Sequence, residues 1–314
     1  MHRTLSAAGA FWLAAFTYFI WGFTFLASRI AQDYGTPFVL LFWRFALAFV
    51  LLNLLRLTGR FPVRLRGRRL WPVLLAGLFE PVLYFPCEQY GLKLTSTSFS
   101  GVMVALIPLC SLVYGAVFLH EKATWRQVVF SVLSVAGVIV LAVYATGIGT
   151  GSFLGFLILL GTVFAGAGYI VACRACSGSF TAFERTYITC GMGAAAFGVL
   201  SVLEHRHDLS AVVLPMTHAP FALAIVFLSV VASVLSYLAL NRALEVLPVA
   251  RTAALINFST VVSVLAGVLL LHEPFGWVSA VASAAILVGI WGVQRFAAPT
   301  VPDTAESAEP LSPS

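Results

Sequence analysis

One hydrophobic pattern occurs twice in this chain. Moving residues 92–140 forward by 152 positions, so that Leu92 reaches Leu244, places them without a gap on residues 244–292. Both copies contain a Leu-His-Glu triplet, with a Trp four residues and a Gly sixteen residues after the Glu. Shared Leu and Val arise easily in an apolar chain, whereas this combination does not. The matching positions are Leu92 and Leu244, Ser111 and Ser263, Gly115 and Gly267, the triplets at 119–121 and 271–273, Trp125 and Trp277, Val129 and Val281, Ser131 and Ser283, and Gly137 and Gly289.

The composition indicates that this repeat lies in a membrane. Hydrophobic residues make up 61% of the chain and charged residues 10%, whereas an average soluble protein has about 25% charged residues. Apolar runs recur at about 20 residues, the length at which a helix crosses a bilayer. The sequence therefore predicts an all-α integral membrane protein with ten transmembrane helices, at residues 9–31, 37–57, 70–91, 97–119, 125–145, 152–173, 180–203, 219–241, 249–271 and 275–296.

The ten predicted helices form two halves of five. We expect a cytoplasmic N-terminus at 1–8, a first five-helix repeat at 9–145, a second at 152–296, and a cytoplasmic tail at 297–314. The tail is rich in Pro, Ser, Ala and Glu, a composition typical of disorder. The first apolar run lacks a small-x-small cleavage site and is longer than the apolar part of a signal peptide, so we expect it to be retained.

The basic residues predict the orientation. If the N-terminus is cytoplasmic, only Arg29, Lys93 and Arg206 of the 18 Lys and Arg residues fall outside, and Arg44 lies within the second helix. This bias follows the positive-inside rule for a multi-pass protein of the cell inner (plasma) membrane. Anionic lipid headgroups account for the positive charge, so the lipid bilayer is an expected partner and nucleic acid is not. The residues on the inner side are Arg3, Arg56, Arg60, Arg64, Arg66, Arg68, Arg69, Lys122, Arg126, Arg174, Arg185, Arg242, Arg251 and Arg295.

An odd number of helices in each half predicts that the two halves are inverted. The second half then enters the membrane from the opposite side, so that Glu121 lies at the cytoplasmic end of the fourth helix and Glu273 at the outer end of the ninth. A pseudo-two-fold axis in the membrane plane relates such halves, and their rocking opens a central cavity to each side in turn. This arrangement favours a carrier over an enzyme.

Several short motifs carry a resemblance to a known family. Over residues 9–296 the chain resembles the drug/metabolite transporter superfamily, EamA type. The resemblance implies an inner-membrane carrier, monomeric or weakly homodimeric, commonly an exporter of amino acids or other small metabolites. It also implies a cavity lined by the first, third, fourth, sixth, eighth and ninth helices. Family members often have a proline in the ninth helix, at the position that matches Pro108 of the fourth helix. This chain has Thr260 at that position instead. The motifs are Leu-x-Glu closing the fourth and ninth helices, Trp21-Gly22, Arg44-Phe45, the stretch at 90–96, and Arg242-Ala243-Leu244.

The third helix carries the first candidates for the transport path, because an ionisable group in a bilayer is costly unless it faces a cavity or a partner. Glu80, Tyr84 and Glu88 follow at intervals of four and share one helix face. The two carboxylates lie about 12 Å apart along the axis. Pro81 and Pro86 interrupt the helix between them and free backbone carbonyls. We expect this face to line the substrate path.

An alternative role for these two acids is structural, in ion pairs with Arg44 or Arg29 that lock the bundle. The resemblance favours this role for Arg44, which is expected to be a structural arginine in an ion pair. Further candidates for the path lie on the first, eighth and ninth helices, on faces that also carry small hydroxyl or aromatic groups. They are Trp21, Phe25 and Ser28, then Ser233, Tyr237 and Asn241, then Asn257 and Thr260.

Other polar groups form no recognisable site. His205-x-His207 lacks a third ligand at a metal-binding spacing, so no metal is expected. Cys173-x-x-Cys176 lies at the cytoplasmic edge, where thiols stay reduced. The sequence contains no Gly-rich phosphate loop, nucleophile motif or His-Glu-x-x-His run. We therefore predict neither catalytic residues nor a cofactor, and do not expect an enzyme.

The predicted path contains carboxylates and hydroxyls, with its cations at the edges. It favours small molecules with an amine, such as amino acids, and disfavours anions unless an arginine enters the cavity. Apolar surroundings favour a protonated carboxyl group, so an acid in the path also suggests coupling to protons. We predict a secondary transporter that exports amino acids or related amine-containing metabolites. The alternatives are a carrier of nucleotide-sugars or drugs, with basic residues of the eighth and ninth helices in the cavity, and a membrane enzyme or sensor.

Overall fold

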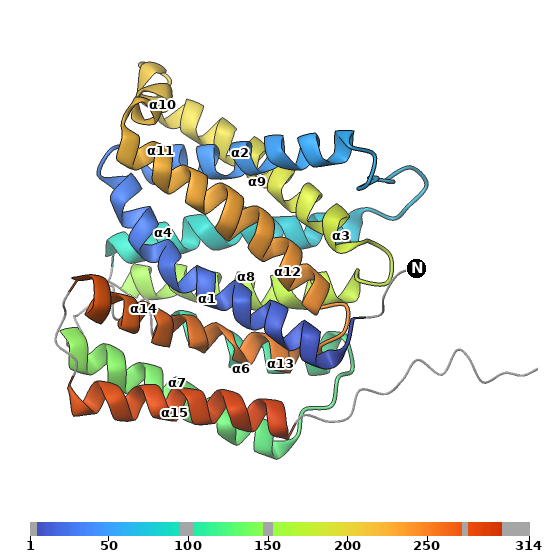
Figure 1. The fold of residues 1–314 in the computed structure, drawn as a ribbon, viewed down its shortest axis with the longest axis vertical. Coiled ribbons are helices and arrows are strands. Elements are labelled where there is room, and N and C mark those ends of the chain that lie inside the picture. The colour runs from blue at the N-terminus through green and yellow to red at the C-terminus, as the bar shows by residue number, and fades with distance from the viewer. Residues whose placement is uncertain (1–4, 95–102, 147–152, 272–275, 297–314) are drawn as a thin grey trace, which may run out of the picture.

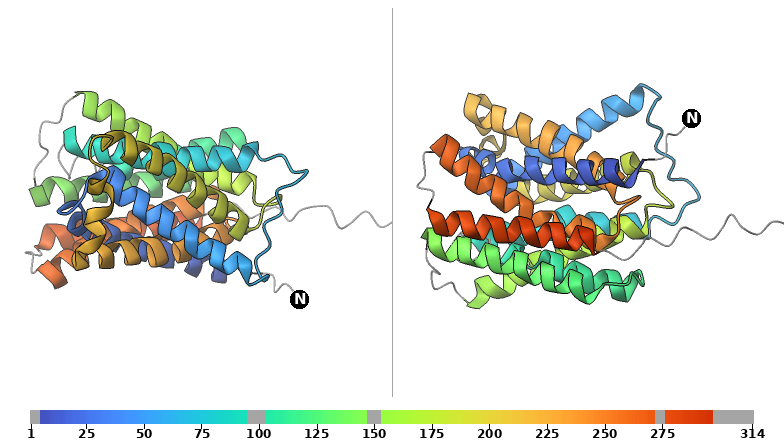
Figure 2. Two further views of the ribbon diagram at one scale, coloured as in Figure 1. Left: turned by 90° about the horizontal axis from the view of Figure 1, so that it is seen from above. Right: turned by 60° about the horizontal axis from the view of Figure 1, so that its bottom comes forward.

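The computed structural model describes residues 5–94, 103–146, 153–271 and 276–296. All regular structure in these ranges is helical, and the helices lie side by side along a common direction (Figures 1 and 2). The tail predicted at 297–314 and the second triplet's His272 and Glu273 lie outside the described residues. The elements are α1 (Ala7–Gln32), α2 (Pro37–Leu57), α3 (Trp71–Gly77), η1 (Leu78–Leu83), α4 (Tyr84–Leu94), α6 (Ile107–Phe118), α7 (Trp125–Thr146), α8 (Phe153–Ala175), α9 (Ala182–Glu204), α10 (Ser210–Val213), η2 (Leu214–Thr217), α11 (Ala219–Val226), η3 (Phe227–Leu235), α12 (Ser236–Ala243), α13 (Val249–Ala254), α14 (Ile256–Leu271) and α15 (Trp277–Arg295).

Length and apolar composition allow six of the described helices to span a membrane. They are α1, α2, α8, α9, the continuous stretch Ala219–Ala243, and α15, and shorter apolar helices lie between them. Large apolar side chains also cover the outside of the bundle. Trp12 is 69% exposed, Leu203 61% and Trp291 58%. Such a surface is unfavourable in water and matches the hydrocarbon of a bilayer, where helices also satisfy their own backbone groups.

Several predicted helices are interrupted along their length. The third is divided into α3, η1 and α4, and the eighth into α11, η3 and α12, where η1 is a kink with non-helical backbone at Glu80 and η3 is a wide π-helical turn. Proline accounts for the first interruption, because Pro81 cannot donate a backbone hydrogen bond. In η3, which contains no proline, the hydroxyl of Ser236 donates to the carbonyl of Val231, five residues earlier, at 2.9 Å. The ninth helix is divided at Leu255 into α13 and α14, also without a proline.

The helices of the two halves pack against each other in matching pairs. α7 packs along α15, and α2 along α9. The contact of α4 with α8 has its counterpart in that of α12 with α1, and the contact of α6 with α8 in that of α14 with α1. α6 also contacts α13. The pattern of contacts between helices is therefore nearly the same when each helix is replaced by its counterpart in the other half.

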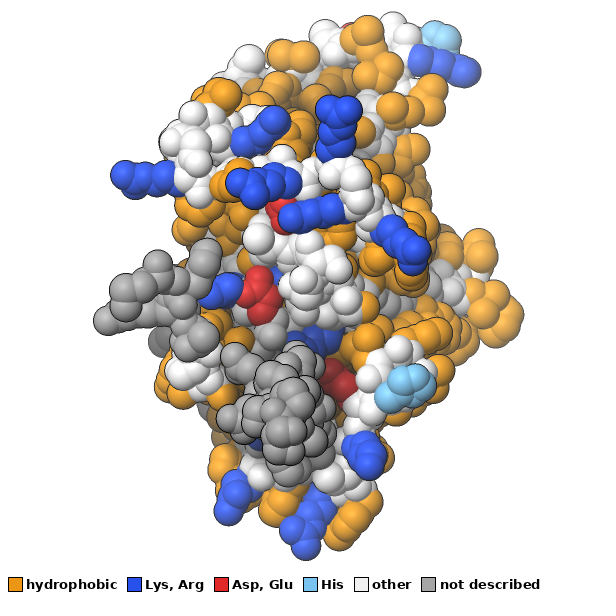
Figure 3. Space-filling view, turned by 90° about the vertical axis from the view of Figure 1, so that its right-hand side faces the viewer, with side chains coloured by type: hydrophobic (Ala, Val, Ile, Leu, Met, Phe, Trp, Pro, Cys, Tyr) orange, Lys and Arg blue, Asp and Glu red, His pale blue; other side chains and the backbone are white. Residues whose placement is uncertain are grey.

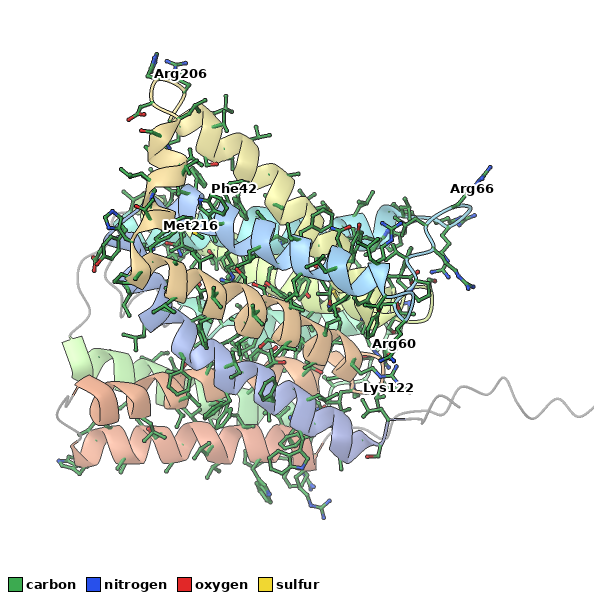
Figure 4. All side chains as sticks on the ribbon, turned by 45° about the horizontal axis from the view of Figure 1, so that its top comes forward. Phe42, Arg60, Arg66, Lys122, Arg206 and Met216 are labelled. Carbon is green, nitrogen blue, oxygen red and sulfur yellow. The ribbon has the colours of Figure 1, made fainter. Side chains whose placement is uncertain are left out.

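Basic side chains collect at one end of the bundle. Figure 4 places Arg60, Arg66 and Lys122 at one end of the bundle and Arg206 and Met216 at the other, and Figure 1 shows that the N-terminus lies at the first of these ends. The space-filling view of the first end shows many Lys and Arg side chains around a few acidic ones (Figure 3). We call this the basic end, defined by the α2–α3 connection at residues 58–70 and by Lys122, and the opposite one the Gln32 end.

Candidate substrate cavity

A cavity of about 300 Å³ lies inside the bundle. Its lining comes from α1, α2, η1, α4, α6, α8, α12 and α14. These elements correspond to the six helices that the resemblance implies, with α2 in addition. Along α1 the lining runs from the buried Tyr18 to the exposed Gln32. The cavity therefore reaches the surface at the Gln32 end, whereas its deepest residues lie halfway along the bundle.

Glu80 reaches the cavity from the interruption of the third helix. Its backbone is extended, with φ −142° and ψ 121°, where the neighbouring residues are helical. The following Pro81 disfavours helical angles at Glu80, so the sequence itself places the break there. The side chain is 6% exposed, and its Oε1 accepts a hydrogen bond of 2.5 Å from the hydroxyl of Tyr237. One acid of the first half is thus held by a tyrosine of the second.

Glu88 lies on the same helix face, nearer the mouth. Its Oε1 accepts a hydrogen bond from the hydroxyl of Tyr84 at 3.2 Å, and its Oε2 one from Nε2 of Gln89 at 3.4 Å. Gln89 in turn accepts from Gln32 of α1 at 2.7 Å. This chain of side chains connects a buried carboxylate to the surface. Glu80, Tyr84 and Glu88 all contribute to the lining, on the face where the sequence placed them.

Arg44 of α2 also lines the cavity. It is 4% exposed, and its Nε donates to Oγ of Ser233 at 2.9 Å. Its guanidinium lies over the ring of Phe85, with Cζ 4.9 Å from the ring centroid, and 5.3 Å from that of Phe45. Within the described part of the chain Arg44 forms no ion pair with a carboxylate, although the sequence suggested one. The resemblance gave no sign that it faces the cavity.

Aromatic side chains enclose the inner part of the cavity. Trp21 is fixed by a hydrogen bond from Nε1 to the carbonyl of Ala232 in η3, at 3.0 Å. Its ring contacts those of Tyr18 and Tyr237 edge to face, with centroids 5.3 and 5.5 Å apart, and Tyr169 lies edge to face against Tyr237. The hydroxyl of Tyr18 is buried and finds no hydrogen-bond partner in the described residues.

The remaining sequence candidates are distributed around this cavity. Ser28 lines it near the mouth, and the side chain of Phe25 lies outside the described part. Ser233 contacts Arg44 from behind. Three further groups lie away from the lining: Asn241, which donates to the hydroxyls of Tyr169 and Thr186; Asn257, which donates to Ser134 of α7 at 3.0 Å; and Thr260.

The sequence analysis did not single out several lining residues. Tyr18 lies three positions before Trp21, so helical periodicity alone indicated that both share a face. Gln89 adjoins Glu88. Tyr169 follows a run of Gly and Ala on α8, and its polar hydroxyl gave no periodic signal. Gln32 lies at the end of a helix, where polar residues are common, so its polarity did not mark it as a candidate.

A polar network closes the bundle between the cavity and the basic end. The fully buried Arg185 of α9 donates to the carbonyls of Cys173 and Asn241, at 2.9 and 2.6 Å, and pairs with Glu245 at 2.9 Å. Arg242 donates to the same carboxylate. Because Asn241 also contacts Tyr169 of the lining, this network begins directly behind the cavity.

Glu121 extends the closed end to the first half of the chain. Its Oε2 accepts from the amide of Val249 at 2.8 Å, and its Oε1 lies 3.5 Å from Nε of Arg174. Arg174 also donates to the carbonyls of Leu244 and Glu245, both at 2.9 Å. Partial burial raises the pKa of Glu121 above its ordinary value, although Val249 and Arg174 oppose this shift. Protonation therefore weakens this contact at a higher pH than it would for an exposed acid.

A helical bundle with an apolar outer surface and an inner cavity that carries charged side chains and opens at one end is the architecture of a membrane transporter. The EamA-like transporter family matches this chain twice, over residues 8–143 and 153–295. The chain belongs to this family, and the transporter predicted from the sequence is confirmed at that level.

Similar proteins agree with this assignment. The uncharacterized transporter YcxC of Bacillus subtilis is 31% identical over 90% of this chain and 91% of its own length. An uncharacterized transporter of Archaeoglobus fulgidus is 26% identical over 90% of this chain and 97% of its own. One solved crystal structure shares the fold with a TM-score of 0.80 at 20% identity, covering 93% of this chain and 98% of that one.

Proposed function

We propose that this transporter exports amino acids or related small amine-containing metabolites by alternating access through the cavity. The observation that carries the proposal is the pair of buried carboxylates, Glu80 and Glu88, in a cavity whose lining also includes the aromatic rings of Tyr18, Trp21 and Tyr237. Carboxylates attract an ammonium group, and aromatic faces stabilise it further by cation–π interactions. The volume of about 300 Å³ suits a small metabolite.

Nucleotide-sugars are a weaker candidate on the same geometry. Their diphosphate would need several cations in the cavity. Arg242 instead pairs with Glu245 behind the lining, and Arg251 of α13 does not contribute to it. Arg44 alone, beside two carboxylates, would not neutralise a diphosphate.

An inverted pair of five-helix repeats, at 9–145 and 152–296, is the architecture that we propose for the transport cycle. The family match falls once in each half, and the interhelical contacts are nearly the same when the halves are exchanged. The positions of the interruptions support it too, because residues 78–83 of η1 correspond to 230–235 of η3 under the 152-residue shift from Leu92 to Leu244. Rocking of the halves would close the Gln32 end and open the basic end.

The basic end faces the cytoplasm of the inner membrane in this proposal, with both chain termini on that side. The positive-inside rule supports it, because Lys and Arg gather there (Figures 3 and 4). In this orientation the described state opens outward. Protonation of Glu80 or Glu88 between the two states would couple export to protons.

Exchange of Glu80 for Gln tests the proposal. The purified protein is screened by thermal shift against amino acids, amines and nucleotide-sugars, and any stabilising compound is then followed as flux into proteoliposomes with and without a pH gradient. We expect amino acids or amines to raise the melting temperature, because a ligand that binds the folded form stabilises it. In Glu80→Gln, affinity should fall at least tenfold while the protein remains folded.

Glu204→Gln is the matched control, since Glu204 lies at the Gln32 end of α9 and bonds Thr36 outside the cavity. It should leave ligand affinity unchanged. Stabilisation by nucleotide-sugars alone would contradict the proposed substrate class. Flux that ignores the pH gradient would remove proton coupling from the proposal.

A further inference from the structure

Arg44 differs from a buried arginine that serves only to hold a bundle together. The same chain offers such an arginine for comparison: Arg185 directs its Nη atoms to two carbonyls and to the carboxylate of Glu245. Arg44, 4% exposed, has Ser233 as its hydrogen-bond partner through Nε, and no carboxylate within ion-pair distance in the described residues. Glu80 and Glu88 share the cavity with Arg44 and offset its charge from a distance, but neither forms a direct ion pair with it. A buried charge is strongly stabilised by a directly bonded counter-ion, so the position beside Arg44 suits an anion that binds from the cavity.

The two terminal nitrogens of Arg44 point to where this anion would bind. Neither Nη atom donates a hydrogen bond to an acceptor in the described part of the chain. Neither of them is fully buried, so both have surface that a bound molecule can contact. Since Arg44 lines the cavity, the accessible space beside them is the cavity itself.

The guanidinium is also held in one orientation. Ser233 fixes Nε at 2.9 Å, and the rings of Phe85 and Phe45 lie 4.9 and 5.3 Å from Cζ. A planar guanidinium anchored in this way presents its two Nη groups as a fork, which matches the two oxygens of a carboxylate. A lysine at this position would supply charge without the fork.

We propose that Arg44 binds the carboxylate group of the transported molecule while Glu80 or Glu88 binds its ammonium group. The inference rests on the proposed function, transport of amine-containing metabolites through this cavity, and narrows it to zwitterions. A simple amine would leave Arg44 without an anion. An N-blocked acid would leave the two carboxylates without a cation. Arg44 is then a residue that determines specificity.

A set of matched ligands tests this assignment on the full-length protein in detergent or nanodiscs. The probes are leucine, leucinamide, isoamylamine and N-acetylleucine, which keep one apolar group and change the charged ends one at a time. The same series built on phenylalanine and on threonine allows for side-chain preference. Affinities are measured by calorimetry or thermal shift. We expect the amino acid to bind at least tenfold more tightly than its amide, its amine and its N-acetyl derivative.

The variants Arg44→Gln and Arg44→Lys test whether Arg44 itself binds the carboxylate. The control variant is Arg206→Gln, because Arg206 is an exposed arginine at the Gln32 end. In Arg44→Gln the amino acid should lose at least tenfold in affinity, while the amide and amine lose less than twofold. Arg44→Lys should recover part of the loss. Arg206→Gln should bind all probes as the unmodified protein does.

The outcomes separate this inference from the proposed function. If the unmodified protein binds the amide or the amine as tightly as the amino acid, Arg44 does not read the carboxylate, although amine transport stands. Equal loss for all probes in Arg44→Gln likewise overturns the assignment in favour of a structural arginine. If no amino acid or amine binds the unmodified protein, the proposed function fails and this inference with it. Should both Arg44 variants fail to fold, the preference of the unmodified protein among the probes decides.

Discussion

At the scale of single residues, side chains on one helix stripe have different roles because each meets a different neighbouring helix. Ser233, Tyr237 and Asn241 follow at intervals of four on η3 and α12. Tyr237 enters the cavity and donates to Glu80, whereas Ser233 accepts from Arg44 and Asn241 donates to Thr186 on α9. The stripe thus has two roles: it contributes Tyr237 to the lining, and its hydroxyl groups hold the charged lining residues Arg44 and Glu80 in place.

Glu121 makes a single-residue contribution that can be measured. It connects the first half of the chain to Val249 and Arg174 of the second at the basic end. In Glu121→Gln, loss of the charge should weaken this contact by about 1 kcal/mol and raise the population open at the basic end about fivefold. Cys173, buried one residue from Arg174, reports the opening. Its labelling by a water-soluble maleimide, followed by peptide mass spectrometry, should accelerate about fivefold.

Cys190, buried in α9, serves as the reference thiol within the same protein. Glu204→Gln, at the opposite end, is the control substitution. Unchanged labelling of Cys173 in Glu121→Gln would mean that this contact does not hold the basic end closed. Equal acceleration at Cys190 would indicate general loosening instead.

At the scale of elements, the repeated glycines have a packing role. Gly137 and Gly289, which match in the two copies, both lie at the contact of α7 with α15. A Cβ on Gly137 would lie 2.8 Å from the carbonyl oxygen of Ala282, and one on Gly289 would lie 2.7 Å from that of Phe130. Small residues of this kind let membrane helices approach closely. The repeat is therefore visible in sequence partly because this helix pair needs the same small residue twice.

Gly289→Ala should destabilise this helix pair. The added methyl group would also meet Cβ of Ser134 at 2.6 Å, so α7 and α15 must separate. Overpacking of this kind costs about 1–3 kcal/mol, which a thermal melt in detergent detects as a lower melting temperature. Gly178→Ala is the control, because a Cβ there meets nothing within 4 Å in the described residues. Equal melting temperatures for the two variants would show that the helices adjust without cost.

At the scale of the whole molecule, the matching helix contacts of the two halves lead to a prediction about membrane topology. If each half has five spans, the connection between the halves lies on the side opposite to both chain ends. An alkaline phosphatase reporter fused after residue 146 should then be active, and one fused after residue 296 inactive, whereas a fluorescent protein should show the reverse. Each of the two reporters is placed in turn at each of the two positions of the full-length protein, and its activity or fluorescence is measured in intact cells. Equal reporter activity at the two positions would mean an even number of spans in each half.

The sequence by itself determined the class of protein and the main acidic face. Apolar runs of bilayer length can satisfy their backbone only as helices, so the all-helical membrane architecture followed from local pattern. The internal repeat and the short motifs carried the resemblance to the EamA family. Helical periodicity within one short segment likewise predicted that Glu80, Tyr84 and Glu88 share a face. The extended backbone at Glu80 follows from Pro81, the next residue in the chain.

The tertiary structure decided which residues of different helices meet. The partner of Arg44 is Ser233, and the partner of Glu80 is Tyr237, each supplied by the other half of the chain. No local pattern predicts such contacts, because they depend on how elements far apart in sequence pack. For the same reason Arg44, for which the family resemblance favoured a structural role, faces the cavity, and Asn257, a candidate for the path, bonds Ser134 behind it.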